Sequence, residues 1–191
     1  MAPFPIYLAV LTILWIAFEI WLVLRDRSKG KGKAAKDKGT LYYNFIALTA
    51  GLTLSGLLGH KSIFFFPGGR SYWGLWIGIG IMLIGFALRI WAVVALGASF
   101  RTTVETHKNQ AVMQSGPYKL VRHPSYSGLI IMCFGYGIAL QNWLSLALAV
   151  ILPIFALLYR IHVEEQALVS SLGEDYAKYQ KRTKKLIPWL W

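Results

Sequence analysis

The stretch YSGLIIMCFGYGIALQNWLSLALAVILPIFALLY, residues 126–159, decides the fold. It contains two apolar runs, Tyr126 to Leu140 and Trp143 to Tyr159, which only Gln141 and Asn142 separate. Two residues are too few to form a soluble segment between two membrane-spanning helices. The sequence therefore predicts a tight hairpin of two helices within the membrane.

Three longer apolar stretches precede this hairpin: Pro5 to Leu24, Leu41 to Leu58 and Tyr72 to Leu96. Each has about the 20 residues, at roughly 1.5 Å per residue, that a helix needs to cross a bilayer. With 56% hydrophobic and only 15% charged residues in 191 positions, the chain is too apolar for a soluble domain of this length. We therefore predict an all-α integral membrane protein with five transmembrane helices. We expect one domain, 1–191, in which an N-terminal helical pair, 1–60, precedes a catalytic core, 72–191.

The distribution of basic residues predicts the orientation. Residues 25–40 hold seven basic and two acidic residues, and 17 of the 20 Lys and Arg lie in segments 25–40, 97–125 and 160–191. Under the positive-inside rule these segments face the cytoplasm, so the N-terminus lies outside and the C-terminus inside. The first apolar run is longer than a signal-peptide core and no Lys or Arg precedes it, so we expect no cleaved signal. Topology and anionic membrane lipids account for the net charge of +12, which does not indicate nucleic-acid binding.

Metal and disulfide chemistry are not expected. Cys133 is the only cysteine, so an intramolecular disulfide and a cysteine-based metal site are excluded. His107, His123 and His162 do not have the spacing of metal ligands.

Glycines in the third apolar stretch favour close helix packing. Gly78 and Gly80 form a G-x-G pattern, but no strand precedes them and the third glycine of a dinucleotide-binding loop is missing. Together with Gly74 and Gly85, they have the spacing that lets helices approach one another in lipid.

Charged residues inside the apolar stretches are candidates for function. Glu19 and Arg89 lie about five and seven residues from the cytoplasmic ends of their stretches, roughly 8 to 10 Å deep. Charges at that depth require partners, so the two residues either neutralise one another, extend to the interface or belong to a site. Arg160 lies at the matching depth, and Glu164 and Glu165 follow it. We expect the arginines and this carboxylate pair to converge at one level.

A polar loop, 97–125, leads into the hairpin. Proline disfavours a helical conformation of the preceding residue, so His123, before Pro124, is predicted to lie on an exposed turn. Gly128 lacks a side chain and would let the flat surface of a ligand approach the helix.

The tail after the last span, residues 164–185, has helical spacing of apolar residues, with a predicted interruption at Gly173. Loop 97–125 and this tail are expected on the same, cytoplasmic side, where the loop can line a site.

Four groups of residues, in this order, resemble the C-terminal signature of the isoprenylcysteine carboxyl methyltransferase family. They are Gly116-Pro117-Tyr118, Arg122-His123-Pro124-x-Tyr126-x-Gly128, Arg160 with Glu164-Glu165, and Leu172-Gly173-Glu174-Asp175-Tyr176. The resemblance covers about residues 85–190. It implies an integral membrane methyltransferase that uses S-adenosylmethionine, forms S-adenosylhomocysteine and takes a lipid-like substrate sideways from the bilayer. It also implies a cytoplasmic cofactor pocket, which we assign to loop 97–125 and the C-terminal tail.

The same resemblance, with the turn and tail just described, implies roles for individual residues. The predicted cofactor-binding residues are Gln110, Val112, Tyr118, Val121, His123, Tyr126, Gly128, Glu164 and Glu165. Arg89 and Arg160 correspond to arginines near the reacting groups and, with Glu165, are the predicted catalytic residues. A carboxylate acceptor needs no general base, because it is already anionic, but it needs a cation that fixes it, and the arginine fork suits two oxygens. The predicted acceptor is therefore an isoprenylcysteine or a related isoprenoid acid.

Three alternatives remain open. A phospholipid N-methyltransferase would share the cofactor pocket and use Glu164 or Glu165 near an amine headgroup, where a proton acceptor is required. Membrane sterol reductases resemble the His-Pro-x-Tyr turn and the tail, but they bind NADPH. A non-enzymatic protein that retains the fold would be expected to lose the charged cluster, which is intact in this chain. The sequence leaves the lipid acceptor and the oligomeric state open.

Overall fold

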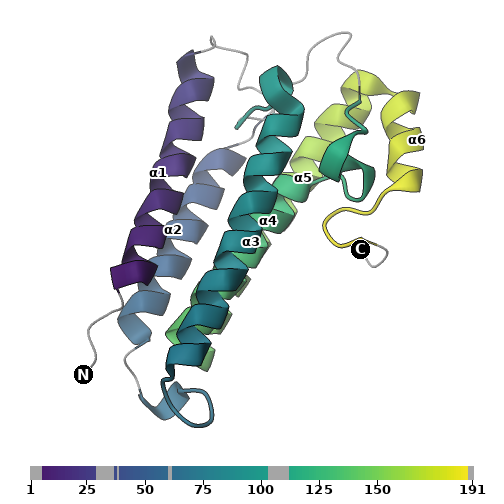
Figure 1. Ribbon diagram of the computed structural model, residues 1–191. Coiled ribbons are helices and arrows are strands. Elements are labelled where there is room, and N and C mark those ends of the chain that lie inside the picture. The colour runs from purple at the N-terminus through teal and green to yellow at the C-terminus, as the bar shows by residue number, and fades with distance from the viewer. Residues whose placement is uncertain (1–5, 29–36, 38, 60–61, 103–111, 189–191) are drawn as a thin grey trace.

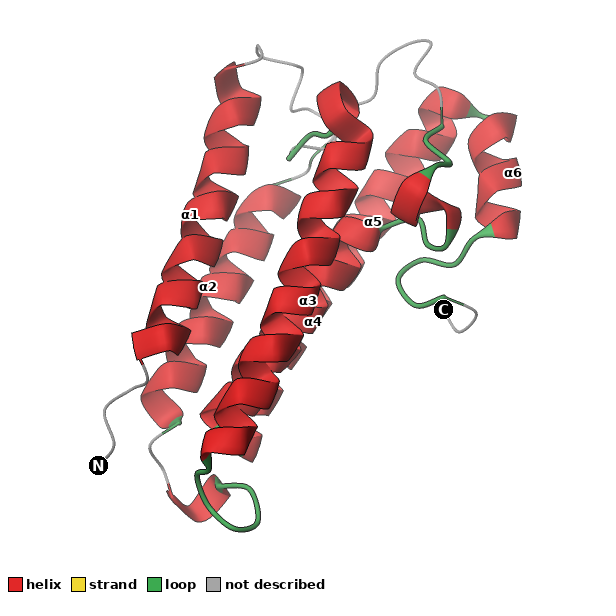
Figure 2. Cartoon of the chain, in the orientation of Figure 1, coloured by secondary structure: helices red, strands yellow, loops and turns green. Residues whose placement is uncertain are grey.

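The protein, described by a computed structural model, is built from helices. The structure describes residues 6–28, 37, 39–59, 62–102 and 112–188, and in this part of the chain it contains no strand (Figure 2). The helices are α1 (Ile6–Ser28), α2 (Thr40–Leu58), α3 (Tyr72–Leu96), α4 (Pro124–Leu140), α5 (Trp143–Leu172) and α6 (Glu174–Arg182). Short 3-10 turns are η2 (Ser62–Phe64), η3 (Gly97–Ser99) and η4 (Gly116–Lys119).

The first five helices run in alternating directions, side by side (Figure 1). Four of them, α1, α2, α3 and α5, are long and apolar enough to cross a membrane, which makes this an integral multi-pass membrane protein. Helix α4 has 17 residues, so it is about 25 Å long and shorter than a hydrocarbon core of about 30 Å. Whether α4 counts as a fifth complete crossing stays a prediction.

The predicted hairpin is present, with a connection of two residues. Gln141 adopts the left-handed conformation (φ 54°), and Asn142 caps α5 by accepting a hydrogen bond from the Ser145 N–H at 3.0 Å. The Gln141 side chain joins the hairpin to the start of α3, because its Oε1 accepts from the Ser71 N–H at 2.7 Å. The two residues that separate the apolar runs thus form a fixed corner.

Helix α5 differs from the predicted span, which ended at Tyr159. It continues without a break to Leu172, and its 30 residues correspond to about 45 Å, longer than the hydrocarbon core. The predicted interruption at Gly173 is confirmed by a positive φ of 56°. The predicted helical end at Lys185 is wrong: α6 stops at Arg182 because the following residues pair with another segment.

Helices α3 and α4 lie against one another through glycines. A Cβ added at Gly78 would be 2.4 Å from the Ala139 nitrogen, and one at Gly85 would be 2.7 Å from the Gly128 oxygen. These contacts confirm the predicted packing role of both residues. Gly80 was predicted to share it and does not, because nothing lies within 4 Å of its added Cβ.

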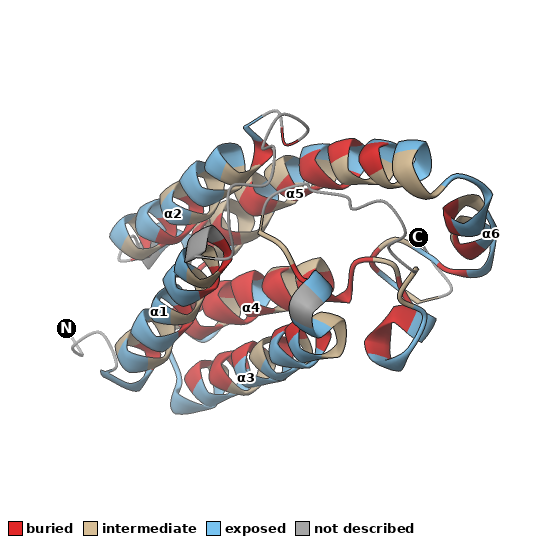
Figure 3. Ribbon diagram, turned by 90° about the horizontal axis from the view of Figure 1, so that it is seen from above, coloured by how far each residue is buried: buried red, intermediate tan, exposed pale blue. Residues whose placement is uncertain are grey.

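Seen from above, the helices turn their buried residues toward one another (Figure 3). The outward faces are apolar and exposed, for example at Ile13 (64%), Val94 (70%) and Phe155 (69%). An apolar exterior of this extent is the surface that lipid covers in a membrane protein.

Candidate active site

The site begins with a turn that the C-terminal tail holds in place. The backbone N–H groups of Arg122 and His123 donate to the carbonyl oxygens of Lys184 (2.8 Å) and Lys185 (3.0 Å). One turn into α4, Ser127 Oγ donates to the Leu186 carbonyl at 2.6 Å. The tail therefore lies along the turn that precedes α4 and fixes the position of His123. The predicted exposure of His123 is wrong: only 5% of its surface is exposed, because the tail and α5 pack against the turn.

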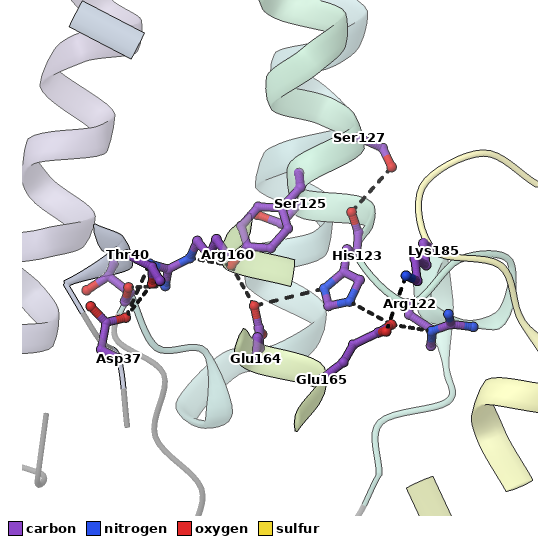
Figure 4. Close-up of polar contacts among 12 residues, drawn as sticks. Asp37, Thr40, Arg122, His123, Ser125, Ser127, Arg160, Glu164, Glu165 and Lys185 are labelled. Atoms are coloured by element: carbon purple, nitrogen blue, oxygen red, sulfur yellow. Dashed lines mark hydrogen bonds and ion pairs between the residues drawn. The ribbon is translucent and has the colours of Figure 1, made fainter. Parts of the chain in front are cut away.

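Glu165, on the last part of α5, contacts Arg122 and His123 of this turn and Lys185 of the tail (Figure 4). Its Oε1 accepts from Arg122 Nε at 2.7 Å and lies 3.3 Å from His123 Nε2, while Oε2 is 3.8 Å from Lys185 Nζ. Arg122 in turn donates through Nη1 to the carbonyl oxygens of Gln180 (3.1 Å) and Thr183. One carboxylate thus joins α5, the turn and the tail.

Glu164 and Tyr126 form the adjacent part of the same cluster. The Tyr126 hydroxyl donates to Glu164 Oε2 at 2.7 Å, and the Tyr126 ring stacks on His123 with centroids 5.5 Å apart and an interplanar angle of 11°. The structure therefore brings together His123, Tyr126, Glu164 and Glu165, all of which the sequence analysis selected. We call these four residues and Arg122 the turn cluster.

Arg160 connects the turn cluster to the N-terminal half of the chain. Its Nε donates to the Tyr126 hydroxyl at 2.7 Å, and Nη2 donates to the Thr102 carbonyl. Its Nη1 reaches Thr40 Oγ1 at 3.1 Å and Asp37 Oδ1 at 3.4 Å (Figure 4). Arg160 is buried, with 4% of its surface exposed, so these contacts hold its guanidinium in one orientation.

Arg89 is also paired. Its Nε and Nη2 each donate to one oxygen of Glu19 at 2.5 Å, and Nη1 donates to the Ser125 hydroxyl at 2.7 Å and carbonyl at 3.1 Å. Of the alternatives for Glu19 and Arg89, mutual neutralisation is therefore confirmed. Because Ser125 belongs to the first turn of α4, this pair also joins α1 and α3 to the segment of the turn cluster.

A third pair closes the group. Asp26 accepts from Arg101 Nη1 at 3.1 Å and from both the N–H and the hydroxyl of Thr102 at 2.7 Å. Glu19, Asp26 and Asp37 are all the acidic residues that precede Glu105 in the sequence. Each of these three carboxylates neutralises a different arginine, so the N-terminal helices supply the counter-charges for the site.

A cavity of about 80 Å³ lies among these pairs. Glu19, Arg89, Arg101 and Arg160 line its polar side, together with Tyr126. The apolar residues that line it are Val23, Leu41, Phe45, Leu48, Phe100, Leu129 and Leu157. A small charged wall beside an apolar wall is the arrangement that a headgroup attached to a hydrocarbon chain requires. We call this space the arginine cavity.

Each cavity arginine retains some capacity for a ligand. Arg89 and Arg160 each make four hydrogen bonds with the described residues. A guanidinium has five N–H groups, so one N–H on Nη2 of each side chain is left over by these bonds. Two fixed donors that line one cavity can position an anionic oxygen group without side-chain rearrangement.

The remaining predicted residues lie elsewhere. Val121 is buried where the turn meets the tail, and Val112 is half-buried. Tyr118 is buried, and its carbonyl accepts from the Tyr179 hydroxyl at 2.7 Å. Gly128 faces α3, where an added Cβ would meet the Gly85 oxygen at 2.7 Å, so its open face serves helix packing and not a ligand. Gln110 lies outside the described residues.

Tyrosines beneath the turn cluster are neutral structural groups. Burial raises the pKa of Tyr179 to about 12, and burial, with the charge of Glu164, raises the pKa of Tyr118. Both phenols therefore keep their protons at physiological pH and act as hydrogen-bond donors, Tyr179 to the Tyr118 carbonyl and Tyr118 to the Ala92 carbonyl of α3.

Sequence reasoning missed Asp26 and Asp37 as parts of the site. Both lie in a segment with seven basic and only two acidic residues, which we interpret as a basic loop. A signal was present for Asp37, because an aspartate just before an apolar helix marks an N-terminus. In the structure Asp37 Oδ2 accepts from the Leu41 N–H at 3.2 Å, and Oδ1 accepts from the Thr40 hydroxyl at 2.9 Å.

Comparisons with known proteins agree on one family. Residues 76–170 match the isoprenylcysteine carboxyl methyltransferase (ICMT) family. The chain is 33% identical over 134 residues to protein-S-isoprenylcysteine O-methyltransferase B of Arabidopsis thaliana, an alignment that covers 67% of this chain and 66% of that protein. It is 33% identical over 129 residues to the probable protein-S-isoprenylcysteine O-methyltransferase of Oryza sativa subsp. indica, covering 65% and 67% of the two chains.

A solved structure has a similar fold. It is that of the eukaryotic intramembrane Ras methyltransferase ICMT without a monobody, with a TM-score of 0.60 and 26% identity, covering 76% of this chain and 52% of that one. The chain thus spans about two thirds of the length of these plant relatives and about half of the length of the solved structure.

Proposed function

Because this chain belongs to the isoprenylcysteine carboxyl methyltransferase family, we propose that it transfers a methyl group from S-adenosylmethionine to the carboxylate of an isoprenylcysteine or a related isoprenoid acid. One observation carries the proposal beyond the family. The Tyr126 hydroxyl donates to Glu164 at 2.7 Å and accepts from Arg160 at 2.7 Å, so it touches both the turn cluster and the arginine cavity. A cofactor on one side of Tyr126 and an acceptor on the other would lie next to one another.

The turn cluster has the groups that such a cofactor needs. Glu165 Oε1 is occupied by Arg122 and His123, but Oε2 faces only Lys185, at 3.8 Å, among the contacts described for it. Oε2 is therefore available to accept hydrogen bonds from an ammonium or ribose group. The stacked rings of His123 and Tyr126 offer an aromatic surface to an adenine or a sulfonium. When bound, S-adenosylmethionine supplies the electrophilic methyl group.

The arginine cavity has the groups that a carboxylate acceptor needs. The nucleophile is already anionic, so no side chain has to remove a proton, and the chain's task is to position and partly desolvate it. The free N–H groups of Arg89 and Arg160 are the donors that we assign to this positioning. The apolar wall accommodates the start of the isoprenoid chain. Because the cavity is only about 80 Å³, the remainder of such a chain would extend between helices into the bilayer.

We place the turn cluster and the C-terminus on the cytoplasmic side and the N-terminus outside. The segments that hold 17 of the 20 Lys and Arg adjoin the C-terminal ends of α1, α3 and α5, and these three ends lie at the end of the molecule where α4 begins (Figure 1). The whole chain, 1–191, would then act as one domain, since Glu19, Asp26 and Asp37 complete a cavity whose arginines come from the core.

Methylation of pure acceptors tests the proposal. The purified protein is given S-adenosyl-[methyl-³H]methionine with a prenylcysteine acid, its amide or its amine analogue. We expect label in the acid and none in the amide. Arg70→Lys, at the opposite end of the molecule, serves as a control that keeps full activity. Faster methylation of the amine analogue would contradict the carboxylate assignment.

One observation favours a second function. The three arginines of the cavity are each paired with a carboxylate, so the cavity does not carry a large positive charge that would repel an amine. A phospholipid N-methyltransferase is therefore the second candidate, with Glu164 as the proton acceptor. The amine arm of the same experiment decides between them.

A further inference from the structure

A second recess lies on the tail, next to the turn cluster. It has a volume of about 270 Å³ and is lined by Arg122, Gln180, Lys181, Arg182, Thr183, Lys184 and Lys185. Five of these seven residues are cationic and none is acidic. We call it the tail recess.

Three of the cations in the tail recess are available to a ligand. Lys181, Arg182 and Lys184 are exposed, and no carboxylate in the described part of the chain pairs with them. Two acidic residues of α5 and α6 have other partners: Glu165 binds Arg122, and Glu174 lies 3.5 Å from Lys178. The recess therefore has a positive potential that its own protein environment does not cancel.

The backbone that carries these cations is fixed. Arg122 Nη1 donates to the carbonyl oxygens of Gln180 and Thr183, and the Arg122 N–H donates to the Lys184 carbonyl. Thr183 Oγ1 also donates to the Tyr179 carbonyl at 2.8 Å. A preorganised frame lowers the entropic cost of binding, so the recess differs from a mobile run of lysines.

The tail recess also lies at the level where α4 begins. The Leu186 carbonyl accepts from Ser127 Oγ, within the first turns of α4. Leu120 and Ile187, each two residues from a residue that lines the recess, are apolar and exposed, at 52% and 50%. Cations flanked by exposed apolar residues at the end of a membrane helix are typical of a segment that contacts lipid headgroups.

We propose that the tail recess binds the phosphate headgroup of an anionic membrane lipid. The phosphate would lie among Lys181, Arg182 and Lys184, with Leu120 and Ile187 in the interfacial layer. Such a lipid would hold the tail against the membrane, and the tail in turn holds the turn that presents His123. The proposal concerns binding and does not depend on which acceptor is methylated.

Native mass spectrometry of the full chain, released from neutral detergent, tests the proposal. Phosphatidylglycerol and phosphatidylcholine are titrated separately, and inorganic phosphate and S-adenosylhomocysteine are added as competitors. We expect saturable binding of phosphatidylglycerol, no comparable binding of phosphatidylcholine, and no displacement by either competitor.

The matched variants differ only in where two charges are removed. Lys181→Gln/Lys184→Gln should weaken phosphatidylglycerol binding roughly tenfold or more, since each lysine near an anionic surface contributes about 1 kcal/mol. Lys119→Gln/Lys178→Gln removes the same charge outside the recess and should change binding by less than about twofold. Unchanged binding of S-adenosylhomocysteine in both double variants verifies that they are folded.

Three results would overturn the proposal. Equal weakening in both double variants would mean a diffuse charge effect without a site. Displacement by inorganic phosphate would mean a site for free anions, and displacement by S-adenosylhomocysteine would assign the recess to the cofactor. None of these results bears on methyl transfer to a carboxylate, so the two proposals fail separately.

Discussion

The turn cluster and the arginine cavity share Tyr126 but are assembled in different ways. The turn cluster comes from segments that lie within or just after the family-matched residues 76–170, and the tail stabilises it. The arginine cavity takes its arginines from the core and its carboxylates from α1 and from Asp37, outside the matched residues. Under the function proposed above, the common part would hold the cofactor and the N-terminal half would adapt the cavity to an acceptor.

The largest expected effect is on the charge pair that joins α1 to the core. Glu19→Gln leaves Arg89 buried beside a neutral partner, and removal of one member of a buried pair costs about 3 kcal/mol or more. We expect a clear fall in the thermal unfolding midpoint in detergent. Glu19→Gln/Arg89→Gln should recover part of the loss, because no charge is then left unpaired.

The exposed pair of Glu174 and Lys178 is the matched control for this experiment. Glu174→Gln should lower stability by no more than about 0.5 kcal/mol, as for surface pairs in general. If Glu19→Gln and Glu174→Gln lower stability equally, the N-terminal carboxylates do not hold the arginine cavity together. The contrast drawn here between the cavity and the turn cluster would then be wrong.

Arg160→Lys tests the cavity with a smaller expected effect. Lysine keeps the charge but cannot reach Tyr126, Thr40 and Thr102 at once, so the positioning of the acceptor is lost. We expect turnover at saturating cofactor to fall about 100-fold, the range for losing one positioned donor. The affinity for S-adenosylhomocysteine should change less than about threefold, as calorimetry can measure. A large loss of that affinity with normal turnover would place Arg160 in the cofactor site.

Glu165→Gln should do the opposite of Arg160→Lys: it should weaken cofactor binding and leave turnover nearly unchanged. Its expected effect is smaller than those of Glu19→Gln and Arg160→Lys. The amide cannot serve as a charged acceptor for Arg122, His123 and the cofactor, so affinity for S-adenosylhomocysteine should fall by about 2 kcal/mol, roughly thirtyfold. Turnover at saturating cofactor should stay within a few-fold of the original. Asp175→Asn, an exposed acid on α6, is the control. Equal affinity in all three proteins would remove Glu165 from the cofactor site.

The sequence predicts the parts of the fold that local pattern controls. Two apolar runs and a two-residue gap were sufficient for the hairpin at Gln141 and Asn142, and Gly173 marked the end of α5. The features of the fold that the sequence did not predict depend on tertiary contacts. Helix α6 ends early because Lys184 and Lys185 pair with the turn, and this pairing links segments about sixty residues apart.

The candidate site was predictable to the extent that its residues form a recognisable pattern. His123, Tyr126, Glu164 and Glu165 belong to such a pattern, and the structure brings them into contact. Asp26 belongs to none, since its partner Arg101 is 75 residues away and no spacing links the two. Gly128 shows the reverse error: its place in the pattern suggested contact with a ligand, whereas the structure places it against α3.

The identity of the methylated atom is the most direct test of the account. Purified protein is incubated with S-adenosyl-[methyl-³H]methionine and a lipid extract to which prenylcysteine acids have been added, and the products are treated with alkali. The account predicts that the label is in a methyl ester of the isoprenoid acid and is released by alkali as volatile methanol. Label that is not released as methanol and stays as a non-volatile N-methyl group, in the headgroup of the deacylated phospholipids, would contradict it.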